Sequence, residues 1–546
     1  MARSIKIVFY AVNGGGVGHL TRMIAIARWA RRYASFAGYR PEIVFLTSSE
    51  ADGVLFHERF ASFKVPSKTA AFEGGLDKAT YLALAKQWVW HSVGLLRPDL
   101  FVVDTFPRGS FSELGACLDL CKKKAFVYRP VKTDFAERAE FQSVLPFYDL
   151  VISPESRDDL VVPPAVLPRV REVGPITVRD PVELDSRDAA RRRLALPADA
   201  FVVFVSAGGV GDPGAERDLH AIVDALSGDP SIHVVVAAGP LYRGAPRVGE
   251  RIRFVTGLGV AELARAADVA VSSAGYNGFH ELMLAGVPTV FIPQEKIADE
   301  QDVRAERARA VGAARVVARP VDRAALLLAV AELRDPVVRA AASAAARALV
   351  PASGARLAAR EILKLVMPTS EIDAAALGFT DEILASARSL GLSESVFVEA
   401  GAALDPGPDD LPPIDARGAT DAAVRLVRGA SELGIPAETA LRVCELLLRK
   451  LDGDDAATRA DACLVLLRAL VPFDDWPGAA ALLRMVSPDP FASAGDVARE
   501  LALLLEELRR DEQDLYRGIQ RVVKRGKLGA PRVATDRTDE PTEDAP

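Results

Sequence analysis

Cysteine is scarce in this sequence, and its few cysteines form no metal-binding or disulfide pattern. Only four occur in 546 residues, namely Cys117, Cys121, Cys444 and Cys463, and no two of them are spaced as Cys-x-x-Cys. Structural zinc sites and disulfide frameworks both use characteristic, closely spaced cysteine pairs. The sequence therefore predicts neither kind of site, and we expect reduced, buried thiols in a cytoplasmic protein.

Long apolar runs and basic clusters are missing as well. Half of the residues are hydrophobic, yet no stretch of about 20 uncharged apolar residues could span a bilayer, and the N-terminus shows no signal-peptide pattern. The net charge is -7, and a mildly acidic chain without a basic run is a poor general binder of nucleic acid. We expect no nucleic-acid partner, whereas peripheral contact with the inner face of a membrane stays open.

Buried strands alternate with amphipathic helices over the first two thirds of the chain. Residues 5–12 (IKIVFYAV) are typical of a strand buried on both faces, and residues 20–34 (LTRMIAIARWARRYA) carry an apolar helical stripe. The same alternation starts again near Val178. The pattern predicts an α/β protein with two doubly wound, Rossmann-like domains. Ligands in such sheets bind beyond the carboxyl ends of the strands, so we expect a site between the two domains.

The composition divides the chain into four expected segments. The Rossmann-like domains are expected at 1–175 and 176–366, the latter ending in helices that break at Pro351. Segment 375–525 is rich in Ala, Leu and Arg with helical periodicity, which predicts an α-helical domain. The polar residues 526–546 predict a disordered tail.

Two glycine-rich loops follow predicted strands. The first, NGGGVGHLTR at residues 13–22, lacks the third glycine of a dinucleotide fingerprint and the Gly-Lys-Ser/Thr of a Walker A loop. Its glycines permit a close approach of the backbone to a ligand and bring His19 to the mouth of the sheet. The second loop, residues 206–212 (SAGGVGD), has amides that could cradle a phosphate. Either loop could also be no more than a tight turn.

The most informative motif is SSAGYNGFHELMLAGVPTVFIP at residues 272–293. A strand ends in a loop of small residues and a helix begins near Asn277, where free N–H groups suit a diphosphate. Glu281 lies one turn inside, where its carboxylate could accept hydrogen bonds from both ribose hydroxyls or merely complement the helix dipole. We expect His280 on the helix surface. Asp299 and Gln301 follow at the same rim, where polar groups suit sugar hydroxyls, as would any charged surface loop.

These motifs together resemble family 28 of the GT-B glycosyltransferases. The resemblance covers roughly residues 5–366, and the first half is similar to a bacterial group of predicted glycosyltransferases of unassigned substrate. It implies that the first domain binds an acceptor and the second a UDP-sugar donor. The implied roles are the ribose for Glu281, the base for Gly257 and Leu258, and the donor sugar for Gln301. The full set of implied substrate-binding residues is Gly15, Gly16, Gly18, Gly208, Gly209, Gly257, Leu258, Ser273, Gly275, Tyr276, Asn277, Glu281, Asp299 and Gln301.

Inverting sugar transfer needs a base for the acceptor proton and stabilisation of the departing diphosphate. His19 is the first candidate for the base, because an ordinary imidazole titrates near pH 6.5. Asp104, at the end of a predicted strand, is the second candidate, as base or as partner of an acceptor hydroxyl; a plain turn residue is the alternative. The sequence has no convincing Asp-x-Asp motif at a strand end, so we expect a helix N-terminus in place of a metal, and no cofactor. Trp88 and Trp90 are expected mainly in the core.

Other functions stay open at this point. A UDP-sugar hydrolase or epimerase of the same fold would use similar loops. A non-catalytic scaffold could bind a nucleotide sugar while its helical region 375–525 docks a protein partner. The donor sugar is unassigned, and the acceptor could be a glycan, a lipid-linked sugar or a small molecule.

Overall fold

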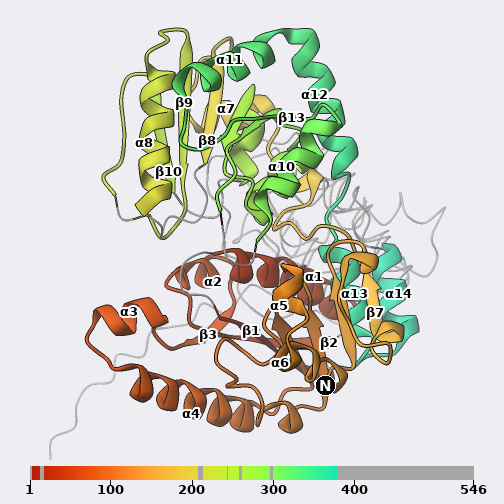
Figure 1. Cartoon of the computed structure of the whole chain (residues 1–546). Coiled ribbons are helices and arrows are strands. Elements are labelled where there is room, and N and C mark those ends of the chain that lie inside the picture. The colour runs from red at the N-terminus through yellow and green to blue at the C-terminus, as the bar shows by residue number, and fades with distance from the viewer. Residues whose placement is uncertain are drawn as a thin grey trace, which may run out of the picture. The chain divides into compact units, whose positions relative to one another are not determined.

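A computed structural model describes most of the first 378 residues of the chain. The described ranges are 3–12, 17–37, 39–129, 131–206, 213–242, 244–256, 261–295 and 299–378, and all of them lie in one compact unit, Met1–Phe379 (Figure 1). The predicted helical segment 375–525, apart from its first four residues, and the predicted tail 526–546 lie outside the described residues.

The first half of this unit is a seven-stranded parallel sheet in the order β3-β2-β1-β4-β5-β6-β7. The strands are β1 (Arg3–Ala11), β2 (Tyr39–Thr47), β3 (Ala61–Lys64), β4 (Leu100–Asp104), β5 (Lys123–Val127), β6 (Leu150–Ser153) and β7 (Val170–Glu172). The helices are α1 (Gly18–Phe36), α2 (Gly53–His57), α3 (Lys68–Glu73), α4 (Lys78–Leu96), α5 (Thr133–Ala136) and α6 (Ala139–Gln142). Because strand order reverses between β1 and β4, the loops after these two strands diverge and leave room for a ligand.

Helices cover both faces of this sheet, which explains the continuous apolar runs of its strands. α1 and α4 lie on opposite faces (Figure 1). The α4 side chains Val89 and Val93 pack into one cluster with Val8 and Tyr10 of β1. Ile7, Val8 and Phe9 are consequently all fully buried. Trp90 of α4 departs from its expected core position, because its side chain faces solvent and is 45% exposed, whereas Trp88 packs against the core.

The second half is a six-stranded parallel sheet in the order β10-β9-β8-β11-β12-β13. Its strands are β8 (Phe201–Ser206), β9 (Ile232–Ala238), β10 (Ile252–Thr256), β11 (Val269–Ser272), β12 (Thr289–Phe291) and β13 (Ala314–Val316). Its helices are α7 (Arg187–Arg193), α8 (Pro213–Ser227), α9 (Tyr276–Ala285), α10 (Gln301–Ala310), α11 (Arg323–Arg334) and α12 (Pro336–Leu349). The prediction of two doubly wound α/β domains is thereby confirmed.

The linker between the halves, which contains Arg179, Asp180 and Glu183, is anchored on α1. The indole Nε1 of Trp29 donates to Asp180 Oδ2 at 2.8 Å, and Arg28 pairs with Glu183 at 2.8 Å. Arg179 pairs with Glu58 of the first half at 2.6 Å and with Glu262 of the second at 2.7 Å. These buried charges tie both sheets to one helix, the same helix that carries His19.

The chain returns to the first half after α12. Helices α13 (Ala355–Leu363) and α14 (Thr369–Gly378) both contact α1, and the predicted break near Pro351 lies between α12 and α13. At the crossing, the Gly354 amide donates to Pro175 O at 2.7 Å. Residues 355–366, which we expected in the second domain, therefore pack against the first sheet.

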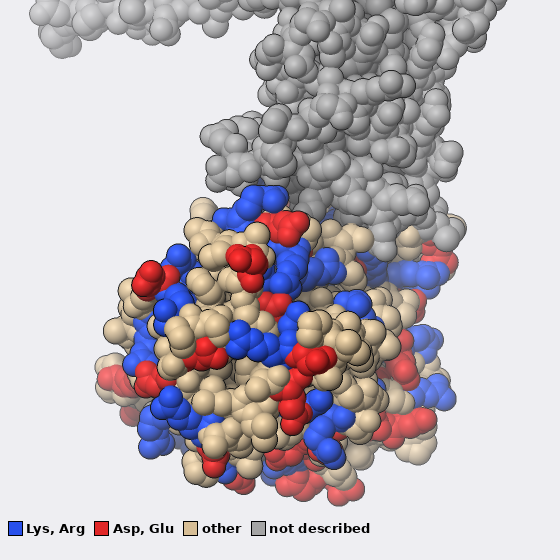
Figure 2. Space-filling model, turned by 90° about the horizontal axis from the view of Figure 1, so that it is seen from above, with Lys and Arg blue, Asp and Glu red and all other residues tan. Residues whose placement is uncertain are grey.

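Neither the described helices nor the face drawn in Figure 2 suggests an extended hydrophobic or basic binding surface. Within the described residues, no helix combines the length and apolar character needed to cross a bilayer. On the face shown in Figure 2, basic and acidic side chains are interspersed. That face lacks the continuous basic area that a nucleic-acid backbone would require.

We predict that Gly354→Ala lowers the thermal unfolding midpoint by several degrees. A Cβ there would lie 2.3 Å from Gly174 O and 2.5 Å from Val173 O, so backbone must move at the crossing. Such overpacking costs about 1–3 kcal/mol, and each kcal/mol lowers the midpoint by roughly 1–2 °C in a unit of this size. The matched control is Gly53→Ala, whose Cβ would meet nothing within 4 Å. Equal midpoints for the two variants in a thermal melt would contradict the close crossing.

Candidate functional site

A histidine and an aspartate meet at the carboxyl edge of the first sheet. β4 ends at Asp104, which is 2% exposed, and His19 lies in the first turn of α1. His19 Nδ1 is 2.5 Å from Asp104 Oδ2, and the ring of Phe106 lies 5.5 Å from the imidazole. Because Asp104 engages Nδ1, Nε2 is the nitrogen left for a substrate. The two predicted catalytic residues are therefore one hydrogen-bonded pair.

Arg22 completes this cluster from the next turn of α1. It is three residues after His19, hence on the same face of the helix, and is 2% exposed. Its Nε donates to Asp104 Oδ1 and its Nη2 to Asp104 Oδ2, both at 2.9 Å. Burial alone would raise the pKa of Asp104, but the Arg22 charge and the His19 hydrogen bond outweigh it and hold that pKa well below its usual range. Asp104 is therefore a permanent carboxylate.

His19 is neutral at physiological pH. Burial lowers its pKa, the hydrogen bond and charge of Asp104 raise it, and the charges of Arg22 and Arg129 lower it again. The net effect is a pKa below 6.5. The imidazole is thus in the form that can accept a proton.

The second component is the N-terminus of α9. β11 ends at Ser272, and α9 begins at Tyr276 after the N-cap residue Gly275, one residue earlier than predicted. No side chain caps this end, so first-turn N–H groups are left to bind a ligand. A Cβ on Gly275 would lie 3.8 Å from Gln301 Nε2 and 3.9 Å from Ser273 Oγ. Three predicted substrate-binding residues therefore share one neighbourhood.

Direct contacts join the two components. Asn277 Nδ2 donates to Gly18 O at 3.3 Å and also to the Thr21 hydroxyl. The Arg22 guanidinium lies over the ring of Tyr276, 5.1 Å from its centroid. The structure thus brings His19, Asp104, Tyr276 and Asn277 close together.

Glu281 lies one turn further along α9, on the same face as Asn277. Burial raises its pKa to about 7, against the opposing charge of Arg179 in the linker. Its side chain keeps partial solvent access. Its pKa is thus close to neutral pH, so the carboxyl group changes charge there.

Comparisons with known proteins identify the family of part of the second half. Residues 252–359, which include all of α9, match the glycosyltransferase family 28 C-terminal domain. These residues belong to glycosyltransferase family 28. The resemblance inferred from the sequence motifs is thereby confirmed.

Individual relatives cover less of the chain. An uncharacterized glycosyltransferase of Methanopyrus kandleri is 31% identical over 163 residues, which are 29% of this chain and 45% of that protein. The UDP-N-acetylglucosamine–N-acetylmuramyl-(pentapeptide) pyrophosphoryl-undecaprenol N-acetylglucosamine transferase of Clavibacter michiganensis is 33% identical over 158 residues, 28% of this chain and 43% of that enzyme. The chain thus spans less than half the length of these curated relatives.

A solved structure, the glycotransferase of kitacinnamycin, is also similar. It is 18% identical with a TM-score of 0.46, and the match covers 67% of this chain and all of that one.

Sequence reasoning missed two arginines that share Asp299, and the first of them, Arg129, connects the family 28 domain to the first half. Arg129, after β5, pairs with Asp299 Oδ1 at 2.8 Å. Arg304, in α10, pairs with the same oxygen at 2.9 Å and donates to Ala274 O at 2.8 Å. Their charges outweigh burial and lower the pKa of Asp299. Arg129 follows a strand at its carboxyl end and Arg304 lies one turn after Gln301, which are the only signals that the sequence offers for them.

The expectation for His280 was wrong. It is 4% exposed, its Nδ1 lies 2.7 Å from Tyr276 O, and it packs against Phe279. Burial lowers its pKa to about 3. α9 is covered on this side too, so His280 is a neutral core residue of the family 28 domain.

Six predicted substrate-binding residues lie outside the described residues. They are Gly15, Gly16, Gly208, Gly209, Gly257 and Leu258. Their predicted roles remain predictions.

We predict that Asp104→Asn destabilises the protein by about 3–5 kcal/mol, because it leaves the buried Arg22 without its anionic partner. The lowered pKa of Asp104 means that its stabilisation is complete above about pH 4 and is lost as pH falls towards the folded-state pKa. Chemical unfolding of wild type and variant at pH 7 and pH 3.5 measures both effects.

Asp158→Asn provides the matched control, because Asp158 is exposed on the surface of the first half. An Asp104 variant as stable as this control at pH 7 would rule out the buried pair.

Proposed function

We propose that this protein is a glycosyltransferase that moves a sugar from a UDP-sugar to an acceptor hydroxyl, with inversion and without a metal ion. One observation carries the proposal. The His19–Asp104 pair of the first half lies beside the α9 N-terminus of the family 28 domain, because its neighbours on α1 contact that end: Asn277 donates to Gly18 O and Thr21, and Arg22, which binds Asp104, lies over Tyr276.

The donor diphosphate binds at the start of α9. Unpaired amides and the positive end of the helix favour an anion there. Arg129 and Arg304 add positive charge that Asp299 only partly offsets. Ser273 and Gly275 allow the diphosphate to approach the backbone. In this proposal the glycine-rich loop 206–212, which contains Gly208 and Gly209, also lies near the diphosphate.

The remaining donor groups follow the chain on either side. Glu281 accepts hydrogen bonds from both ribose hydroxyls, and the backbone of Gly257 and Leu258 meets the base. Asp299 and Gln301 hold the donor sugar. A charged carboxylate on a vicinal diol is a strong, bidentate acceptor.

The reaction transfers one proton and one glycosyl group. Nε2 of His19 takes the proton of the acceptor hydroxyl as its oxygen attacks the anomeric carbon. The bond from that carbon to the diphosphate breaks on the opposite face, so configuration inverts and UDP leaves with the electron pair. Asp104 keeps the imidazole oriented and stabilises its charged form, while the α9 amides stabilise the leaving diphosphate.

A Glu281→Gln variant is expected to lose selectivity for the ribose hydroxyls. Wild type should bind UDP at least about tenfold more tightly than 2′-deoxy-UDP, because a hydrogen bond to a charged group contributes about 1.5–3 kcal/mol. The variant should bind both weakly and almost equally. With UDP-N-acetylglucosamine, wild-type affinity should rise as pH passes through 7, because Glu281 ionises there, and the variant should show no such rise.

Isothermal titration of both proteins at pH 6 and 8 makes these measurements. Glu306→Gln, on the exposed face of α10, is the control and should behave as wild type. If Glu281→Gln retained the wild-type isotherms, the ribose assignment would be wrong.

His19→Ala should lower turnover by about 10²–10⁴-fold, the usual contribution of a general base, and leave UDP affinity unchanged. At saturating UDP-sugar, wild-type turnover should stay level through neutral pH and fall only under acidic conditions, because the pKa of His19 lies below its ordinary value. The readout is UDP release from a panel of UDP-sugars with and without added acceptors.

His57→Ala, exposed at the end of α2, should leave turnover intact. UDP release that needs no acceptor would indicate a hydrolase instead, and interconversion of sugars an epimerase. Binding of UDP without turnover would indicate a scaffold, and full activity of His19→Ala would exclude His19 as the base.

A further inference from the structure

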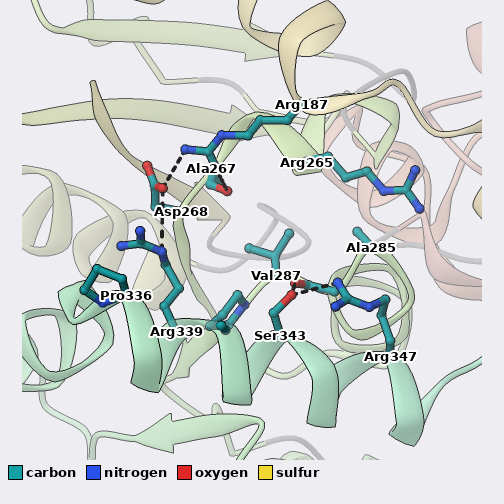
Figure 3. Close-up of a pocket in the computed structure, with 13 residues that line it drawn as sticks. Arg187, Arg265, Ala267, Asp268, Ala285, Val287, Pro336, Arg339, Ser343 and Arg347 are labelled. Atoms are coloured by element: carbon teal, nitrogen blue, oxygen red, sulfur yellow. Dashed lines mark hydrogen bonds and ion pairs between the residues drawn. The ribbon is translucent and has the colours of Figure 1, made fainter. Parts of the chain in front are cut away.

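A second pocket lies at the opposite edge of the family 28 domain from the candidate site. It has a volume of about 430 Å³ and opens at the amino ends of β11 and β12, whereas the donor is expected at the carboxyl ends (Figure 3). Its charged lining residues are Arg187 of α7, Arg265 of the 3₁₀ helix Ala261–Ala266, Asp268, and Arg339 and Arg347 of α12. The lining thus contains four arginines and one carboxylate.

Both oxygens of the Asp268 carboxylate already have close partners. Asp268 is 4% exposed and lies 2.7 Å from Arg187 and 3.0 Å from Arg191, and its Oδ2 also accepts the Val202 amide at 2.8 Å. Arg339 is more distant, with its Nε 3.8 Å from Oδ1. Asp268 therefore neutralises the arginines of α7 and leaves the α12 charges in excess.

Arg347 has only a neutral partner among the described residues. Its Nη1 donates to Ser343 Oγ at 2.8 Å, and Ser343 in turn donates to Gly286 O at 2.6 Å. In Figure 3, Arg347 and Arg339 lie on either side of Val287. A Cβ at position 286 would lie 2.5 Å from Arg347 Nη1, so glycine there makes room for the guanidinium at the end of α9.

We propose that this pocket binds a small phosphate-bearing anion. Like charges held around a recess raise the free energy unless an anion offsets them, and arginine forks match the oxygens of phosphate in bidentate geometry. The volume suits a small ligand rather than a polymer. The site is independent of the proposed sugar transfer, because it lies at the other edge of the sheet and shares no side chain with the candidate catalytic site.

Calorimetric titration of pyrophosphate into the full chain, with the donor site saturated by UDP, tests this inference. Wild type should bind one pyrophosphate, and Arg347→Gln should weaken binding at least tenfold. Arg339→Gln, on the other side of the pocket, should also weaken it and serves as the second variant if the first is unstable. Arg309→Gln is the control, because Arg309 is exposed on α10 and paired with Glu306.

Absence of pyrophosphate binding to UDP-saturated wild type would overturn the proposal. Equal affinity in wild type and both pocket variants would do so as well. Failure of UDP to bind would count against the proposed function only. The same titration without UDP would then test the anion pocket, because pyrophosphate binding should still be weakened by Arg347→Gln and Arg339→Gln.

Discussion

The negative charge of Asp104 organises the candidate site, because two side chains take their positions from it. Arg22 binds both carboxylate oxygens and is thereby aimed at Tyr276 of the other half. His19 is oriented through Nδ1, which leaves Nε2 for a substrate. A fully buried arginine is tolerated only with such a partner, so packing, orientation and protonation state all depend on one strand-end carboxylate.

Most of the fold could be predicted from the sequence because it depends on local periodicity. Strands buried on both faces are continuous apolar runs, and β1, β4 and β8 were found for that reason. β3, β7 and β13 have only three or four residues each and lie at or near sheet edges, where burial is partial and the pattern is too short to read. The return of α13 to the first half depends on tertiary packing against α1, which no local pattern shows.

The candidate site was predictable to a similar extent. Positions at strand ends and helix starts, such as Asp104 and Tyr276, follow from the rule that parallel strands present their carboxyl ends to a ligand. The ion pair of Arg129 with Asp299 joins residues that are 170 positions apart in the sequence, so only the folded chain shows it. The prediction that His280 lies on the surface was wrong because α9 is buried on more than one side. Such a helix has no single polar face, so the 3.6-residue periodicity does not show which side chains are exposed.

Helix α9 explains why both edges of the second sheet carry arginines, and why they are not equivalent. Its N-terminus offers amides to an anion, and its C-terminus at Gly286 offers carbonyls, which favour a cation. Arg347 and Ser343 meet that requirement, and Arg187 and Arg191 neutralise Asp268. Arg187 and Arg191 share the single charge of Asp268, and Arg339 lies 3.8 Å from the same carboxylate, so the two arginines of α12 keep positive charge at this edge. Because the protein itself leaves this positive charge uncompensated, we expect the pocket to bind an external anion.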